Sequence, residues 1–175
     1  MCGYTIYYKT RKKVSKEEVA ECVEAIKEII EENKEIVVID YPDEVNKYNI
    51  NFNGFGDEGH ETFCFDSNYK EDIREEIIDN LEDVKQKDSG VIFNGELGFC
   101  FCKTARKKYD KVCKLALIKI QEITNNKFEI SCDDGYSYEK TGIYKTKYSK
   151  DVGSRGEFVT NNLNDLAKDY DWGEE

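Results

Sequence analysis

The sequence predicts an α+β fold of one domain, in which a mostly antiparallel sheet is packed by about three amphipathic helices. Strand-like runs and helical segments interleave along the 175 residues, but hairpin turns are frequent, which favours α+β over a doubly wound parallel sheet. The chain is long enough to bury a core without disulfides or metals. One domain is therefore expected over residues 1–175.

The central stretch runs from Gly95 to Ile123 and carries the clearest pattern. A strand-like run from Leu97 to Cys102 enters a basic turn, Lys103 to Lys108, and a helix follows. Apolar residues recur there at helical spacing, which predicts one buried face. They are Tyr109, Val112, Cys113, Ala116, Leu117, Ile120 and Ile123.

The first 35 residues predict a strand and a helix. Residues 2–10 are aromatic and β-branched, as strands are. Ser15 and Glu18 have the spacing of a capping box, with Val14 and Val19 placed as a hydrophobic staple. The inner helix face is Val19, Val23, Ile26 and Ile30, and the solvated face is Glu17, Glu21, Glu24, Glu28, Glu31 and Glu32.

Residues 35–41 predict a short buried strand that ends at Pro42. Residues 47–52 and 60–65 predict an antiparallel hairpin, joined by the glycine-rich loop 53–59. Residues 127–132 predict another strand, which closes with the turn Asp133-Asp134-Gly135.

The remaining segments give weaker patterns. Residues 68–84 predict a further helix, and 91–93 a short strand before the tight turn Asn94-Gly95. Residues 136–161 are less regular and could form a loose hairpin carrying Tyr136, Tyr138, Tyr144 and Tyr148. Residues 162–171 have helical spacing, and 172–175 form an acidic tail.

Composition narrows the class of protein. The seven cysteines have no framework spacing, which indicates free core thiols in a reducing cytoplasm and no zinc or other metal site. No apolar run approaches the length of a membrane span, and no cofactor is indicated. A cytoplasmic protein is expected.

The net charge of −11 argues against direct nucleic-acid binding overall, although most acidic proteins are acidic simply for solubility.

The basic turn is the first candidate site. The window from Lys103 to Lys114 holds six Lys or Arg and one acid, a net charge of +5, which leaves −16 for the rest of the chain. Cations gathered where helix N–H groups point outward suit a phosphate or carboxylate. The candidate anion ligands are Lys103, Thr104, Arg106 and Lys107, with Tyr109 and Asp110 in support. The alternative is that Lys107, Lys108, Lys111 and Lys114 only solvate the outer helix face.

His60 is the second candidate, as the single histidine of the chain. It could contact the same ligand, with Glu61 in support, or act as a base, or only cap a loop. Adjacent side chains on a strand point to opposite faces, so His60 and Glu61 are not expected to touch. Gly54, Gly56 and Gly59 have GxGxxG spacing, but a strand follows them where a nucleotide fingerprint needs a helix. Cys2 could be an N-terminal nucleophile, although a strand residue is the simpler interpretation.

Three motifs together resemble a family of small uncharacterised proteins encoded by phages and prophages. They are GHETF at Gly59 to Phe63, CKTARKKYD at Cys102 to Asp110, and SCDDG at Ser131 to Gly135. Lys108 stands where the family pattern has Pro. The family supplies no activity, so the resemblance implies a mobile-element origin and an accessory role on host machinery, including host defence.

Two functions follow as hypotheses, beside the third option of a plain structural module. The first is a non-enzymatic accessory protein that binds a host protein or ribonucleoprotein and blocks a nucleic-acid-targeting defence system, as anti-CRISPR proteins do. The second is a binder or processor of a phosphate-bearing ligand at the basic turn, whether a nucleotide or a nucleic-acid end. The second gains if the GHETF strand and the basic turn converge in space.

Overall fold

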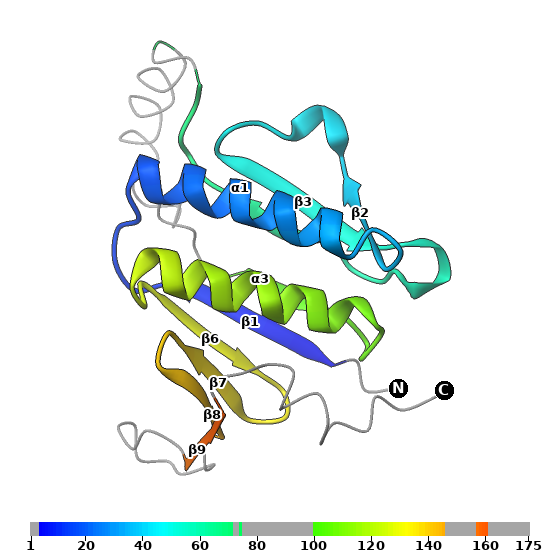
Figure 1. Cartoon of the computed structure of the whole chain (residues 1–175), viewed down its shortest axis with the longest axis vertical. Coiled ribbons are helices and arrows are strands. Elements are labelled where there is room, and N and C mark those ends of the chain that lie inside the picture. The colour runs from blue at the N-terminus through cyan, green and yellow to red at the C-terminus, as the bar shows by residue number, and fades with distance from the viewer. Residues whose placement is uncertain (1–3, 72–73, 75–99, 146–156, 161–175) are drawn as a thin grey trace, which may run out of the picture.

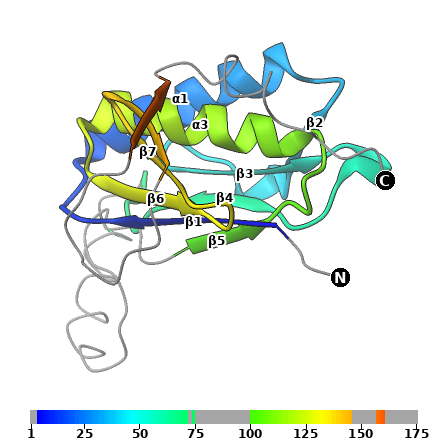
Figure 2. The ribbon, with the colours of Figure 1, turned by 90° about the horizontal axis from the view of Figure 1, so that it is seen from below.

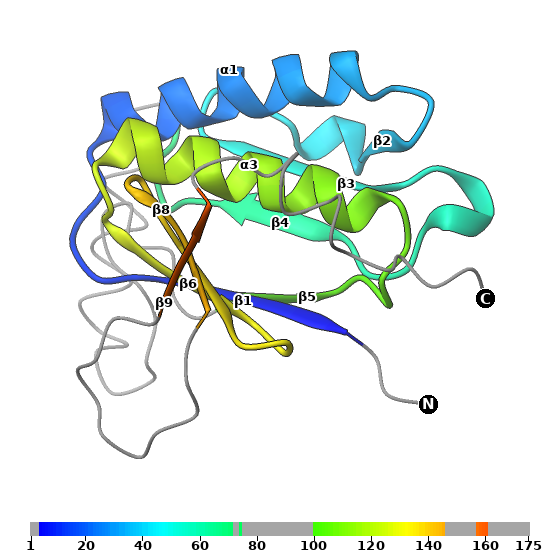
Figure 3. The same cartoon turned by 60° about the horizontal axis from the view of Figure 1, so that its bottom comes forward.

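A computed structural model describes residues 4–71, 74, 100–145 and 157–160, and it has the antiparallel α+β architecture that the sequence predicts. Helices α1 (Lys16–Glu32) and α3 (Tyr109–Thr124) lie side by side (Figure 1). Figures 2 and 3 show both helices on one side of the strands. Neither helix is long and apolar enough to cross a membrane.

Within the described residues, the larger sheet has six antiparallel strands in the order β5-β1-β6-β7-β8-β9. Their bounds are β5 Cys100–Lys103, β1 Thr5–Thr10, β6 Phe128–Cys132, β7 Tyr136–Glu139, β8 Gly142–Lys145 and β9 Glu157–Thr160. Strand β1 lies between β5 and β6, with Tyr7 opposite both Phe101 and Ser131. The loose hairpin predicted after residue 135 is confirmed as β7 and β8, with Ser137 opposite Tyr144.

The smaller sheet has the order β2-β3-β4, with β2 at Val37–Asp40, β3 at Asn49–Gly54 and β4 at Phe63–Asp66. The predicted hairpin is confirmed as β3 and β4, and its loop contains a short 3-10 helix, η2 (Gly56–Glu58). A second one, η1 (Pro42–Glu44), follows β2. The two sheets meet where the Tyr8 hydroxyl of β1 donates a 2.5 Å hydrogen bond to the Cys64 carbonyl of β4.

The prediction of a buried strand over residues 35–41 is wrong in its burial. Strand β2 pairs only with β3 among the described strands, so it lies at the edge of the smaller sheet. Val37 faces the core, whereas Val38 is 44% exposed. An unbroken apolar run does not distinguish a buried strand from an edge strand, because a single strand carries no information about its neighbours.

The predicted capping box of α1 is present. The Ser15 hydroxyl accepts a 3.1 Å hydrogen bond from the Glu18 amide, and the Glu18 carboxylate accepts a 2.8 Å bond from the Ser15 amide. The four predicted inner residues of α1 are buried, and the six glutamates of the opposite face are exposed. The cap and the two-sided pattern together explain why this segment forms a helix.

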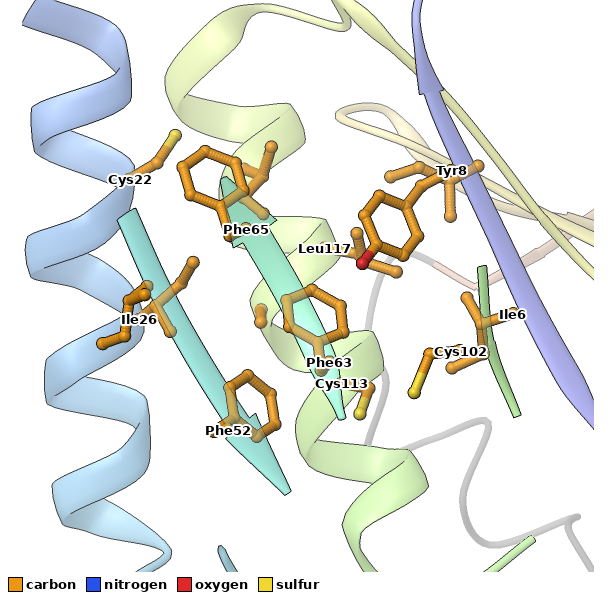
Figure 4. Packing of buried hydrophobic residues seen from close by; sticks show 14 of the residues in the cluster. Ile6, Tyr8, Cys22, Ile26, Phe52, Phe63, Phe65, Cys102, Cys113 and Leu117 are labelled. Carbon is orange, nitrogen blue, oxygen red and sulfur yellow. The ribbon is translucent and has the colours of Figure 1, made fainter. Parts of the chain in front are cut away.

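The strands send aromatic and aliphatic side chains toward the two helices, and these side chains form one core (Figure 4). Tyr8 stacks on Phe63 with ring centroids 5.2 Å apart, and Phe63 stacks on Phe52 at 4.8 Å. These three rings come from β1, β4 and β3, so they join the two sheets. Cys22 and Cys113 fill helix positions in the same core, and the six described cysteines are all free thiols, as predicted.

The predicted apolar face of α3 is buried as far as Ile120, and Ile123 is partly buried. One alternative is corrected here, because Lys114 does not solvate an outer face and is only 1% exposed. Helix α3 packs against α1 on one side and against β6 and β7 on the other, so a second face of this helix is covered. Asp110, Gln121 and Thr124 are buried on α3 for the same reason.

Several predictions fall outside the described residues. They are the strand residues before Tyr4, Cys2 included, most of the helix over 68–84, the strand over 91–93 with its turn, the start of the run at Leu97, Tyr148, the helix over 162–171 and the tail over 172–175.

A candidate functional site at the turn before the central helix

The backbone between β5 and α3 is held in an unusual shape. Ala105 and Arg106 both have left-handed conformations, with φ of 51° and 59°, which residues with a side chain seldom adopt. The amides of Thr104 and Ala105 both donate to the Tyr4 carbonyl, at 2.9 and 3.3 Å. The Asp110 amide then donates to the Lys107 carbonyl at 2.9 Å and starts the helix. Strained backbone of this kind persists only where its surroundings fix it.

The GHETF segment is one of those surroundings. The Glu61 carboxylate accepts a 2.9 Å hydrogen bond from the Lys103 amide, and the Glu61 amide donates to the Lys103 carbonyl at 3.3 Å. The Tyr109 hydroxyl donates to the Glu61 carbonyl at 2.8 Å. The predicted strand begins only at Phe63, so most of GHETF precedes β4. The GHETF segment and the basic turn nevertheless converge, which is the arrangement that the phosphate-ligand hypothesis requires.

Two of the basic side chains bind the loop before GHETF. The Lys107 ammonium donates a 2.5 Å hydrogen bond to the Asp57 carbonyl, and the Lys108 ammonium lies 4.0 Å from the Glu58 carboxylate. Both partners belong to η2. Lys107 thus helps to hold the turn against the loop, and exposed pairs such as Lys108–Glu58 contribute little on their own.

Lys103, Arg106 and Lys108 are the exposed cations of the turn, and Lys108 faces Glu58. The Arg106 guanidinium lies 4.8 Å from the centre of the Tyr4 ring, and the Lys103 ammonium 5.9 Å from that of Phe101. Both distances suit a cation over an aromatic face. A ligand in solvent could therefore reach Lys103 and Arg106 without displacing an ion pair such as Lys108–Glu58.

The inner side of the turn is a buried polar cluster. The Thr104 hydroxyl donates a 2.5 Å hydrogen bond to one Asp110 oxygen, and the Lys114 ammonium lies 2.7 Å from the other. Burial raises the pKa of Asp110, against the lowering effect of Lys114 and Thr104. Asp110 also stands in the first turn of α3, where the helix dipole favours a negative charge. The Asp110 carboxylate therefore lies at the helix N-terminus, where the sequence predicted a bound anion.

The SCDDG motif reaches the same corner of the molecule. The Tyr4 hydroxyl donates to Asp134 at 3.2 Å, and the Cys132 thiol donates to the same oxygen at 2.6 Å. The Lys114 ammonium lies 4.6 Å from the centre of the Tyr4 ring. Tyr4 thus links two of the three motifs, CKTARKKYD and SCDDG.

Sequence reasoning missed Tyr4, Asp134 and Cys132 as members of this cluster. The only sequence signal was the SCDDG motif itself, since Tyr4 lies 130 residues from Asp134. Burial beside Asp134 raises the pKa of the Cys132 thiol to about 12. A thiol in that state is a poor nucleophile, so the cluster has the character of a structural network.

His60 lies apart from this network. Two hydrogen bonds hold it through its backbone, from the His60 amide to the Asn53 side chain at 3.1 Å and from that side chain to the His60 carbonyl at 3.2 Å. The imidazole is exposed. The structure thus places Lys103, Thr104, Arg106, Lys107, Glu61, Tyr109 and Asp110 around one turn, with His60 at its margin.

In the part of the chain that the structure describes, no three His, Cys, Asp or Glu side chains come together as a metal site. Comparison with family models, curated proteins and solved structures gave no match.

Proposed function

We propose that this chain is a non-enzymatic accessory protein of phage or prophage type, which binds a host protein that acts on nucleic acids and occupies the surface that phosphates would use. The observation that carries the proposal is the exposed line of glutamates on α1. The cluster at the turn supports a binding role, because its thiol, carboxylate and ammonium are buried against one another rather than presented to a substrate.

The glutamates of α1 form a regular array. Five of them, Glu17, Glu21, Glu24, Glu28 and Glu31, are separated by steps of four and three residues, which places them in one line along the helix. At a rise of about 1.5 Å per residue the line is about 21 Å long, or about 5 Å per carboxylate. Phosphates in one strand of DNA follow one another at about 3.4 Å along the helix axis. A basic groove that tracks a nucleic-acid backbone could therefore accept this helix.

The test is competition for nucleic acid. A host protein captured by the chain is purified, and its binding to labelled target DNA or RNA is measured while the chain is titrated in. We expect the nucleic acid to be displaced at about one chain per captured protein, because both ligands occupy one surface. If the captured protein keeps its nucleic acid at saturating chain, the proposal fails.

A matched pair of variants separates the array from net charge. Glu21→Lys/Glu28→Lys changes the line on α1, and Glu122→Lys/Glu129→Lys changes two exposed glutamates elsewhere. Both variants move the formal net charge from −11 to −7. We expect the first to lose displacement by at least about tenfold and the second to retain it, because close charge pairs at interfaces couple by more than 1.4 kcal/mol. Equal losses would point to net charge alone.

A second candidate function is the binding of a phosphate-bearing ligand, such as a nucleotide, at Lys103 and Arg106. The convergence of the GHETF segment with the basic turn favours it, because that contact fixes the backbone from which both side chains project. Asp110 is an acidic residue in the first turn of α3, where a bound anion would otherwise lie. A ligand in solvent would therefore depend on the side chains of Lys103 and Arg106.

A thermal-shift titration with mono-, di- and cyclic nucleotides and short oligonucleotides tests this second function. A ligand at 100 times its dissociation constant stabilises the folded chain by about 2.7 kcal/mol, a shift of several degrees. Lys103→Ala/Arg106→Ala should abolish a selective shift, while Lys111→Ala on the next turn should keep it. A flat response across the panel would exclude the small-ligand function.

A further inference from the structure

Large apolar side chains are exposed along the outer edge of β2, and acidic residues surround them. Among the described residues, five large apolar side chains are well exposed, and three of them gather at this edge: Val38 at 44%, Tyr41 at 55% and Phe55 at 61%. Tyr41 follows the strand directly in a left-handed conformation. Phe55 adjoins the other end, where its amide donates a 2.7 Å hydrogen bond to the Ile36 carbonyl.

The register places Val38 and Phe55 on the same side of the sheet. Val38 lies opposite Asn53, so Phe55, two residues on, is its diagonal neighbour on the face away from the core. The opposite face carries Val37 and Phe52, which are buried. The exposed pair is therefore a small apolar surface at the rim of the sheet.

The backbone of β2 is also open to pairing on that side. The Phe55–Ile36 hydrogen bond shows which residues of β2 bond to β3 in the antiparallel ladder. The backbone N–H and C=O groups of Val38 and Asp40 point to β3, whereas those of Val37 and Ile39 point to the open edge. The Val37 amide is already bonded to the Asn33 carbonyl at 3.0 Å. The Ile39 amide and carbonyl point to the edge, with which no described strand pairs.

The negative charge around β2 indicates what kind of partner binds at its open edge. From Glu35 to Glu44 the chain has four carboxylates and no Lys or Arg, and Asp57 adds another beside Phe55. A second copy of the chain would bring the same carboxylates against these, at a cost in repulsion. An extended segment with alternating apolar and basic residues would match the apolar pair, the open backbone groups and the carboxylates together.

We propose that β2 is a docking edge, which adds an extended, basic segment of a partner polypeptide as a further strand. The inference rests on the proposed function in that it names the kind of segment by which the partner is held. The partner contributes backbone hydrogen bonds to Ile39, alternate apolar side chains over Val38 and Phe55, and Lys or Arg beside Glu35, Asp43 and Glu44.

The test uses a synthetic seven-residue peptide that alternates lysine or arginine with valine, and a control peptide with glutamate at the basic positions. Binding is measured by calorimetry, and hydrogen exchange of the chain's amides is followed by NMR. We expect the basic peptide to bind, the acidic one not to bind, and the Ile39 amide to exchange at least about tenfold more slowly at saturation. Absence of binding at millimolar peptide, or binding without protection of Ile39, overturns the proposal.

Variants locate the site. Ile39→Pro removes the outward N–H, which the β2–β3 ladder does not use, so it should weaken binding by about tenfold, the effect of one lost backbone hydrogen bond. Ile39→Val keeps that N–H and should bind as the wild type does. Because Pro at this position could disturb folding, Val38→Lys is the second variant, and it should weaken binding similarly while every backbone group is retained. Unchanged binding by Val38→Lys overturns the proposal.

The experiments distinguish a failure of the proposed function from a failure of the docking edge. If Glu21→Lys/Glu28→Lys retains full competition with nucleic acid, the proposed function is contradicted whatever the peptide does. If the wild-type chain displaces nucleic acid while Ile39→Pro and Val38→Lys compete equally well, the docking edge alone is wrong. Sedimentation that shows a dimer lost in Val38→Lys would assign the edge to a second copy and overturn the basic partner.

Discussion

Asp110 and Lys114 form an ion pair of 2.7 Å in which both side chains are removed from solvent, with exposures of 0% and 1%. The pair joins successive turns of α3, and Thr104 binds the other oxygen of Asp110 from the end of β5. Buried charges are tolerated only where they are paired and hydrogen-bonded. The pair therefore fixes the start of α3 to the turn that carries the candidate site.

Lys114→Met tests that role. It should lower the free energy of unfolding by about 3–5 kcal/mol, because it leaves the Asp110 carboxylate buried without its counter-charge. Urea unfolding at pH 7 measures the loss. The control is Lys111→Met, a half-buried basic position on the same helix, which should change stability by less than about 1 kcal/mol. Similar losses in the two variants would contradict a specific role of the ion pair.

Asp110 should also give the stability of the chain a particular pH dependence. Burial raises its pKa in the folded state, although Lys114 and Thr104 act against this and Asp134 adds to it. The folded chain then binds the Asp110 proton more tightly than the unfolded chain does. The stabilising contribution is full below the unfolded pKa of about 3.9 and is lost as the pH rises through the folded pKa.

Comparison with Asp110→Asn isolates this effect, because Asn does not titrate. The free energy of unfolding of the wild type, minus that of Asp110→Asn, should decrease as the pH rises from 3.5 and then level off. A difference that stays constant from pH 3.5 to 7 would show that the pKa of Asp110 is not raised.

Glu18 should act in the opposite direction. Burial alone would raise its pKa, but hydrogen bonds from Lys127 and from the Ser15 amide outweigh it, and the pKa is lowered in the folded state. Its contribution is present above the unfolded pKa of about 4.3 and is lost as the pH falls through the folded pKa.

Glu18→Gln should therefore cost about 1 kcal/mol at pH 7, since it weakens the cap and removes a partly exposed ion pair. The cost should shrink as the pH falls below 4.3, which urea unfolding at several pH values would show. Glu17→Gln, an exposed neighbour in the same helical turn, should cost almost nothing at any of them. Equal costs in both variants would remove the special role of Glu18.

The elements that could be predicted are those whose signal is local. The capping box at Ser15, the apolar face of α3 and the alternation of Phe63 and Phe65 each lie within one segment, and all are present in the structure. The edge position of β2 could not be predicted, because it depends on which strands lie beside it.

The candidate site was likewise predictable only in part from the sequence. The i, i+4 spacing of Asp110 and Lys114 is visible in the sequence, but it is equally typical of a surface pair. What buries it is the packing of α3 between α1 and the strands β6 and β7. The role of Tyr4 depends on partners more than 100 residues away, so periodicity and spacing had no means of showing it.

Phe63 should be a main contributor to stability, because its ring lies between those of Tyr8 and Phe52 and is fully buried. Phe63→Ala should cost about 3–5 kcal/mol through lost burial and the cavity it leaves. Phe55→Ala is the control, since that ring is mostly exposed and should matter by less than about 1 kcal/mol. Chemical unfolding of both variants decides the point, and a loss below 1 kcal/mol for Phe63→Ala would contradict this account of the core.

The glycines of the loop before β4 should differ sharply in what they tolerate. A Cβ at Gly54 would overlap the Glu58 carbonyl, with its carbon at 2.6 Å and the Gly59 Cα at 2.9 Å, so the backbone would have to move. At Gly56 the space is open, and the only cost is the left-handed φ of 58°, about 1 kcal/mol for alanine.

Gly54→Ala should therefore destabilise the chain by clearly more than Gly56→Ala in thermal or urea unfolding. The same displacement would move η2, whose Asp57 carbonyl accepts the hydrogen bond from Lys107, so the amides of the basic turn should exchange faster in Gly54→Ala alone. The GxGxxG spacing is then explained by close backbone packing at Gly54 and Gly59 rather than by a bound nucleotide. Equal stability and equal exchange in the two variants would contradict that explanation.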